Sequence, residues 1–265
     1  MTSVKELVLE IRENTAFLTF NRPAVNALTA SMLESLASTL KGLESDRNVR
    51  CAVIRGSGDK AFSVGMDLSA MVEGSPEENQ GLIGPGGPLR RALDAIEGCP
   101  FPVIAMIRGY ALGAACELAV ACDLRVGSEN CQVGMPPARL GIVYPADGLR
   151  RFLERVGPST TIKLFLTGER FEAGEAMRMG MLDFALPDER LEEFTMELAG
   201  TLAGNAPLSI KGHKRALRLL SKRAPLSEAD EAELDSMSSE AMRSADAEEG
   251  LAAFFEKRDP DFKGE

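Results

Sequence analysis

Glu117 is the only charged side chain between Tyr110 and Cys122, in a run that is otherwise small and apolar. A helix that starts at Gly113 has first N–H groups without intrahelical partners, and these groups bind an anion or an oxygen that gains negative charge. Glu117 follows Gly113 and Ala114 by one turn and can face the same space. This spacing predicts enolate chemistry, in which the Ala114 N–H holds the oxyanion and the carboxylate moves a proton. Apolar surroundings leave the pKa of that carboxylate free to rise.

The alternative is that Glu117 is an ordinary exposed residue of a helix. Leu118, Val120 and Cys122 surround it with apolar side chains, which favours a buried position. The functional interpretation is therefore preferred.

A second backbone donor is expected in residues 61–68, which follow an apolar run at 49–54. Gly65 permits a backbone conformation that exposes the next N–H, that of Met66. Asp67 is then suited to cap a helix. Taken alone this segment is a weak signal, because loops with glycine between a strand and a helix are common.

The elements that position these segments are read from hydrophobic spacing. The first twenty residues are typical of a hairpin, and Thr29 is a cap for a helix with apolar positions 32, 33, 36, 40 and 43. Further strands are expected at 49–54, 102–107, 124–126 and 183–186. Helices are expected at 89–99, within 148–180, and at 189–203, 207–222 and 227–257. Residues 73–88 are rich in Gly, Pro and polar residues and are interpreted as a loop that acts as a lid. This order predicts an α/β core followed by a C-terminal helical region.

Composition excludes several classes of function. The 265 residues carry a net charge of −10, which argues against a general nucleic-acid binder. The five cysteines lie mostly in apolar runs and are interpreted as reduced core thiols of a cytoplasmic protein. The N-terminus lacks the pattern of a signal peptide, and no apolar run is long enough for a membrane span. The lone His213 lies in no metal-ligand cluster, so we expect neither a metal nor a separate cofactor.

Five motifs in order resemble the crotonase, or enoyl-CoA hydratase/isomerase, superfamily over nearly the whole chain. They are Asn21-Arg22-Pro23 with Asn26-Ala27-Leu28, GSGDKAFSVGMDL at 56–68, PVIAMIRGYALGAACELAVACDLRV at 102–126, LTGERFEAGEAMRMGML at 166–182 and AAFFEKRDPDFKG at 252–264. The resemblance implies a ββα spiral core at 1–200 and a C-terminal helical region at 201–265 that supports trimer contacts. A homotrimer or a hexamer is the implied assembly.

The resemblance also implies an acyl-CoA thioester as the substrate. It assigns the thioester oxygen to the N–H groups of Met66 and Ala114, and it makes Glu117 the acid/base. Further implied contacts with the substrate are Val64, Gly65, Leu68, Gly113, Pro137 and Lys211, with Phe254 and Lys257 of a neighbouring subunit.

The chain departs from the usual hydratase pattern at Pro137, where the family's second catalytic glutamate is expected. A proline can neither accept nor give a proton, so neither two-carboxylate hydration nor isomerisation follows directly from the resemblance. Pro137 and Tyr144 resemble the methylmalonyl-CoA decarboxylase branch, although that branch has a histidine where this chain has Met66. Tyr144 is then a candidate to bind a substrate carboxylate or donate a proton, or else a core tyrosine.

Three functions are therefore predicted. The first is an acyl-CoA enzyme of the hydratase/isomerase type, which holds a thioester enolate and uses Glu117 as its one acid/base. The second is a decarboxylase of a malonyl-type CoA thioester, and the third is a non-catalytic acyl-CoA-binding protein. Basic residues on helix 207–222, among them Lys211 and Lys214, are either contacts for the CoA phosphates or a solvated face.

Overall fold

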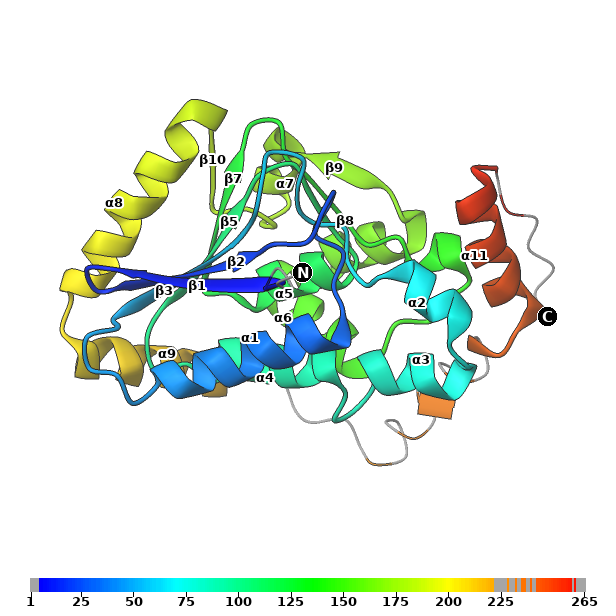
Figure 1. Cartoon of the computed structure of the whole chain (residues 1–265), viewed down its shortest axis with the longest axis horizontal. Helices are drawn as coiled ribbons and strands as arrows, with labels where there is room; N and C mark the ends of the chain where they lie inside the picture. The colour runs from blue at the N-terminus through cyan, green and yellow to red at the C-terminus, as the bar shows by residue number, and fades with distance from the viewer. Residues whose placement is uncertain are drawn as a thin grey trace.

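The computed structural model describes residues 5–221 and 242–258, together with the single positions 228, 232, 235, 236, 239 and 260. A six-stranded sheet forms its centre, with the order β1-β2-β3-β5-β7-β10 (Figure 1). These strands are Leu7–Arg12, Thr15–Phe20, Cys51–Gly56, Val103–Ile107, Leu124–Ser128 and Phe184–Leu186. The β1–β2 hairpin is antiparallel and all other pairs are parallel, as expected for strands joined through helices.

A second sheet, with the order β4-β6-β8-β9, continues from the first. Its strands are Ala61–Ser63, Tyr110–Leu112, Gln132–Gly134 and Arg170–Glu172. The sequence did not predict these elements, because three residues are too few to show the alternation of a strand. This sheet places the ends of β4 and β6 beside each other, since Ser63 pairs with Ala111.

Helices cover both faces of the central sheet. The first four are α1 at Ala30–Leu43, α2 at Leu68–Glu73, α3 at Pro76–Ile83 and α4 at Pro88–Gly98. The next are α5 at Ala114–Ala121, α6 at Ala146–Thr167, α7 at Ala173–Arg178, α8 at Leu191–Gly204, α9 at Pro207–Ser221 and α11 at Ala245–Glu256. Short 3-10 helices, η1 at Pro137–Leu140 and η2 at Asp188–Arg190, complete the described elements.

Successive side chains of β2 point to opposite faces of the sheet, and this alternation divides the hydrophobic core into two clusters. Leu18 and Phe20 join the large cluster with α1 and α4, whereas Phe17 faces a smaller cluster with Leu191 and Ala199 of α8. α5 lies between α4 and α6, so all eight of its residues are buried. This mixed α/β arrangement confirms the predicted fold class.

All five cysteines are buried and free. Burial raises the pKa of Cys116 and of Cys122 to about 12, so these thiols stay protonated. The predicted burial of the cysteines in the core is confirmed.

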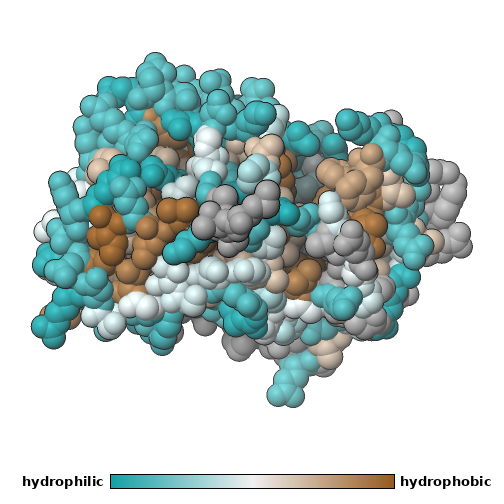
Figure 2. All heavy atoms as spheres, in the orientation of Figure 1, coloured by the Kyte–Doolittle hydropathy of each residue, from teal (hydrophilic) through white to brown (hydrophobic). Residues whose placement is uncertain are grey.

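Most of the face in Figure 2 is hydrophilic, with a hydrophobic patch in the region of β1. β1 is an outer strand of the sheet, and it exposes Val8, Leu9 and Ile11. No helix of the described part of the chain is long and apolar enough to cross a membrane. The trimer or hexamer and the division at residue 200 stay predictions.

Two expectations are wrong in part. Residues 73–88 contain the helix α3 instead of a continuous loop. Its start is a capping box, because the Ser75 N–H donates to the Glu78 carboxylate at 2.8 Å and the Glu78 N–H donates to the Ser75 hydroxyl at 3.2 Å. The helix expected at 227–257 is observed as α11, and most residues before 242 lie outside the described ones.

The predicted cap of α1 gives a stability test. Thr29 Oγ1 accepts from the Met32 N–H at 3.1 Å and donates to Glu6 at 2.8 Å. We expect Thr29→Ala to cost about 1 kcal/mol of unfolding free energy and to lower Tm by about 2–4 °C, measured by calorimetry. Ser38→Ala, on the exposed side of the same helix, should not lower Tm. Equal losses in the two variants would contradict the assigned cap.

Candidate active site

The loops that follow β4 and β6 converge at Gly65 and Gly113. Both glycines have positive φ, 93° and 55°, a region that side chains disfavour. A Cβ atom at Gly65 would lie 2.7 Å from the Leu112 carbonyl oxygen and 3.3 Å from the Ala114 nitrogen. Only glycine therefore lets the two loops approach this closely.

The backbone N–H of Met66 points away from its neighbouring segment. Leu28 pairs with Met66 in a parallel bridge, donating to Gly65 O at 2.8 Å and accepting from Asp67 N at 2.9 Å. In such a bridge the central residue directs its own N–H to the opposite side. Ala114 is the first residue of α5, so its N–H has no intrahelical acceptor. Among the described residues, neither N–H donates a hydrogen bond.

A cavity of about 590 Å³ opens where these two loops meet. Many of the residues predicted for the site line it, namely Val64, Gly65, Met66, Leu68, Gly113, Ala114, Pro137, Tyr144 and Phe254. Lys211 and Lys257 are exposed and are not among the lining residues. The volume lies in the usual range for small-molecule sites.

Glu117 lies behind the cavity wall and does not line it. Its side chain is 2 % exposed, and Tyr144, which does line the cavity, donates its hydroxyl hydrogen to Glu117 Oε2. Arg151 Nη1 donates to the other oxygen, Oε1. The buried position of Glu117 is confirmed. Glu117 was expected to face the cavity itself, but in the structure it contacts Tyr144, and Tyr144 is the residue that lines the cavity.

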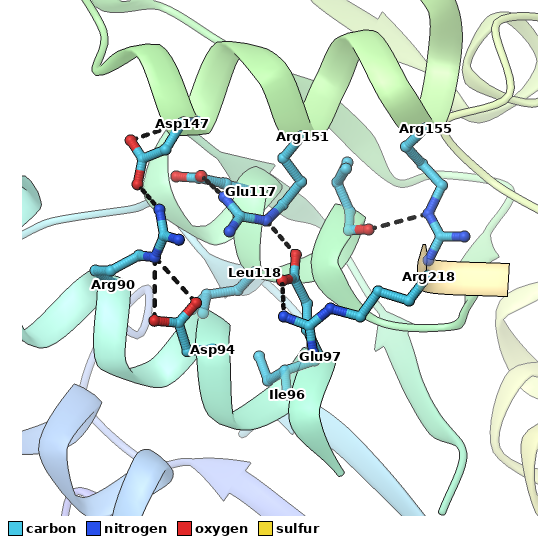
Figure 3. A network of polar contacts seen from close by, with 12 residues as sticks. Arg90, Asp94, Ile96, Glu97, Glu117, Leu118, Asp147, Arg151, Arg155 and Arg218 are labelled. Carbon is cyan, nitrogen blue, oxygen red and sulfur yellow. Dashed lines mark hydrogen bonds and ion pairs between the residues drawn. The ribbon is translucent and has the colours of Figure 1, made fainter. Parts of the chain in front are cut away.

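Arg151 is the site residue that the sequence analysis missed. Figure 3 shows it projecting from α6 between Glu117 and Glu97. Its Nε donates to Glu97 Oε1 at 2.5 Å, and Arg218 of α9 donates to Glu97 Oε2 at 3.0 Å. The available signal was helical spacing, because Arg151 follows Asp147 by four residues and so shares its face.

Burial dominates the electrostatics of this cluster. It raises the pKa of Glu117, while Arg151 and the hydrogen bond from Tyr144 oppose that rise. Burial, together with the charge of Glu117, holds the pKa of Tyr144 well above its usual value. The Tyr144 hydroxyl therefore stays protonated over the ordinary range of pH.

Pro137 also lines the cavity. The described lining residues include only one carboxylate, Asp67. That carboxylate forms an ion pair with Arg22 at 2.6 Å. No group of three His, Cys, Asp or Glu within the described ranges could hold a metal ion. Tyr144 is thus the one phenol among the described lining residues.

One expectation for the C-terminal region requires correction. Lys214 of α9 points inward and pairs with Asp123 at 2.6 Å, so this lysine belongs neither to a solvated face nor to the cavity. Phe254 lines the cavity of its own chain, and its expected contact with the substrate of a neighbouring subunit stays a prediction. α11 lies directly against η1. A Cβ atom at Gly250 would be 2.6 Å from the Leu140 carbonyl carbon. A Cβ atom at Gly141 would likewise be 2.6 Å from the backbone oxygen of Asp246.

Residues 10–265 match the family described as enoyl-CoA hydratase/isomerase. The chain belongs to this family. It is 34 % identical over 264 residues to a 2,3-dehydroadipyl-CoA hydratase of Escherichia coli K12, covering 98 % of this chain and all of the relative. It is 36 % identical to a carnitinyl-CoA dehydratase of Salmonella heidelberg, covering 93 % of this chain and 94 % of the relative.

Solved structures add a second comparison. A methylmalonyl-CoA decarboxylase in complex with 2-nitronate-propionyl-CoA is similar with a TM-score of 0.90 at 28 % identity, over 99 % of this chain and all of that one. An enoyl-CoA hydratase/carnithine racemase from Magnetospirillum magneticum gives 0.78 at 30 % identity, over 99 % of this chain and 97 % of that one. This member of the family is an acyl-CoA enzyme of the hydratase-like group.

The approach of the two loops can be tested with Gly65→Ala. The added Cβ meets the Leu112 carbonyl and separates the two N–H groups. We expect the Kd for acetyl-CoA, measured by titration calorimetry, to rise roughly 10-fold or more. Gly58→Ala is the matched control, because Gly58 also has positive φ but open space around its Cβ position. Similar affinities of the two variants would contradict the assigned convergence.

The raised pKa of Glu117 predicts a pH dependence of stability. The folded state holds this proton more tightly, so the group stabilises the fold below its unfolded pKa, and that stability is lost as pH rises through the folded value. From about pH 4.5 upward, wild type should therefore lose unfolding free energy relative to Glu117→Gln. Urea unfolding at pH 5 and pH 8 measures this difference. Glu129→Gln, which removes an exposed carboxylate, is the control, and a wild-type advantage that grows with pH would refute the prediction.

Proposed function

We propose that this protein decarboxylates a malonyl-type CoA thioester. The N–H groups of Met66 and Ala114 hold the thioester oxygen as it gains negative charge, and Tyr144 supplies the proton to the enolate carbon. Loss of carbon dioxide needs an oxyanion site and a proton donor, but it needs no carboxylate base to activate water. The substrate's own thioester delocalises the electrons, so the proposal includes no separate cofactor.

The observation that carries this proposal is the order of the groups beside the cavity. Tyr144 faces the cavity and Glu117 lies behind it, while Pro137 occupies the position where a second carboxylate would stand. The raised pKa of Tyr144 keeps its hydroxyl protonated over the working range of pH, so a proton is present there to be transferred.

The backbone shape supports the same choice. The decarboxylase structure is similar with a TM-score of 0.90, compared with 0.78 for the hydratase/racemase, although the latter is slightly more identical in sequence. The agreement therefore lies in the arrangement of elements rather than in the count of identical residues.

Hydration of an enoyl-CoA is the second candidate. It is favoured by the hydratases and dehydratases that are 34–36 % identical to the chain. In this reaction Glu117 would have to activate water through Tyr144, since Tyr144 lies between the carboxylate and the cavity. Binding of an acyl-CoA without turnover is a third possibility, motivated by Pro137. We further infer a cytoplasmic protein and a homotrimeric or hexameric assembly, following the family resemblance.

Separate incubation with methylmalonyl-CoA and crotonyl-CoA distinguishes these functions. We expect carbon dioxide and propionyl-CoA from the first substrate, detected by mass spectrometry, and no hydrated product from the second. Hydration of crotonyl-CoA without carbon dioxide release would replace the proposal by the second candidate. Ligand binding without turnover across an acyl-CoA panel would support the third candidate, a protein that binds acyl-CoA without catalysis.

Substitutions test the roles of the two side chains. Tyr144→Phe removes the donor, and Glu117→Gln removes the carboxylate behind it while keeping a similar shape. Each should lower kcat by about 10²–10⁴, the usual contribution of a positioned acid or base. Tyr110→Phe is the control, because Tyr110 is outside the cavity lining. Near wild-type turnover of Glu117→Gln would remove that residue from the mechanism.

A further inference from the structure

The two oxygens of the Glu117 carboxylate have different partners. Oε2 accepts from the Tyr144 hydroxyl, whereas Oε1 accepts from Arg151 Nη1. Arg151 is 9 % exposed and divides its guanidinium between Glu117 and Glu97. A change at Glu97 therefore reaches Tyr144 through two buried side chains.

Other charged groups face this cluster from the packed helices. α6 contributes Asp147 as well as Arg151, and α4 contributes Arg90, Asp94 and Glu97 (Figure 3). Arg90 pairs with both Asp94 and Asp147, which offsets much of the negative charge on that side. From α9, Arg218 pairs with Glu97 at 3.0 Å. Arg151 is thus the one cation in the described network that contacts Glu117 directly.

The protonation of Glu117 decides which way the hydrogen bond to Tyr144 runs. An ionised carboxylate only accepts, so the Tyr144 hydroxyl donates to Glu117 Oε2 and does not offer its hydrogen to the cavity. A protonated Glu117 can donate to the Tyr144 oxygen instead, which frees the phenolic hydrogen to point into the cavity. The second arrangement is the one ready to donate a proton to a substrate.

We propose that Arg151 and Glu97 are positioning residues that set, with opposite signs, the direction of the Tyr144–Glu117 hydrogen bond. This inference rests on the decarboxylation proposed above. Arg151 favours the ionised carboxylate, in which Tyr144 is turned away. Glu97 shares the guanidinium and adds a negative charge, and so it favours the protonated, donor-ready arrangement.

The proton balance follows from this arrangement. When the bond to the departing carboxylate breaks, its electron pair forms the enolate and carbon dioxide leaves. The enolate carbon takes the Tyr144 proton, and the Tyr144 oxygen takes the proton of Glu117. The ionised Glu117 then remains paired with Arg151 until a proton from water restores it, so each turnover consumes one proton.

The test is the pH profile of kcat/KM for Arg151→Gln and Glu97→Gln, with methylmalonyl-CoA as substrate. Activity falls at high pH as Glu117 ionises. Loss of the Arg151 cation should move this limb upward by about one pH unit or more, because an adjacent opposite charge has an effect of that size. Loss of the Glu97 charge should move it downward.

Arg218→Gln is the matched control, since Arg218 contacts Glu97 but not Glu117. It should shift the limb in the same direction as Arg151→Gln but by less. Opposite shifts at Arg151 and Glu97 support the proposal, because a purely structural role lowers activity at every pH without moving the limb. Unmoved limbs, or shifts of the same sign in the two variants, would overturn it.

A second readout does not depend on turnover. The chain has two tyrosines, so Tyr110→Phe leaves Tyr144 alone, and its 13Cζ resonance can be followed by NMR as pH changes. We expect the resonance to show one titration step. Arg151→Gln should raise the midpoint pH of this step, and Glu97→Gln should lower it. The same steps in an enzyme that decarboxylates nothing would support the positioning roles and reject the proposed function alone. A resonance that does not titrate, or identical steps in all variants, would reject the positioning roles.

Discussion

The buried carboxylate of Glu117 is the constraint on which this site depends. An ionised group at 2 % exposure loses most of its hydration, and the loss of a buried charge partner typically costs about 3–5 kcal/mol. Arg151 and Tyr144 offset that cost, one on each oxygen. Because α4, α5 and α6 must pack closely to bring these groups together, the packing of three helices and the protonation of one side chain are coupled.

The backbone donors have a separate origin, which is local. Two glycines with positive φ allow the loops after β4 and β6 to approach, and the bridge between Leu28 and Met66 turns one N–H outward. The second N–H is free because α5 begins at Ala114. The two backbone donors are thus supplied by chain geometry, whereas the contact between Tyr144 and Glu117 is supplied by tertiary packing.

This difference explains how far the sequence could be interpreted. Gly65, Gly113 and Glu117 could be identified because loop glycines, a helix start and a charge in an apolar run are local signals. Arg151 could not be assigned, because its contacts come from α4 and α5, more than thirty residues away along the chain. The second sheet was missed because its strands have three residues each, and the inward direction of Lys214 depends on Asp123, which lies between α5 and β7. The capping box at Ser75 and Glu78 was readable but was hidden by the surrounding Gly and Pro residues.

The packing of α11 against η1 has a consequence for the shape of the cavity. Gly250 in α11 and Gly141 after η1 allow the two backbones into close contact. As a result, α11 and the part of the cavity wall that carries Pro137 form one packed unit. A displacement of α11 would therefore disturb η1 as well. Because Phe254 of α11 also lines the cavity, exchange of that helix would change the shape of the cavity and leave the loops at Gly65 and Gly113 in place.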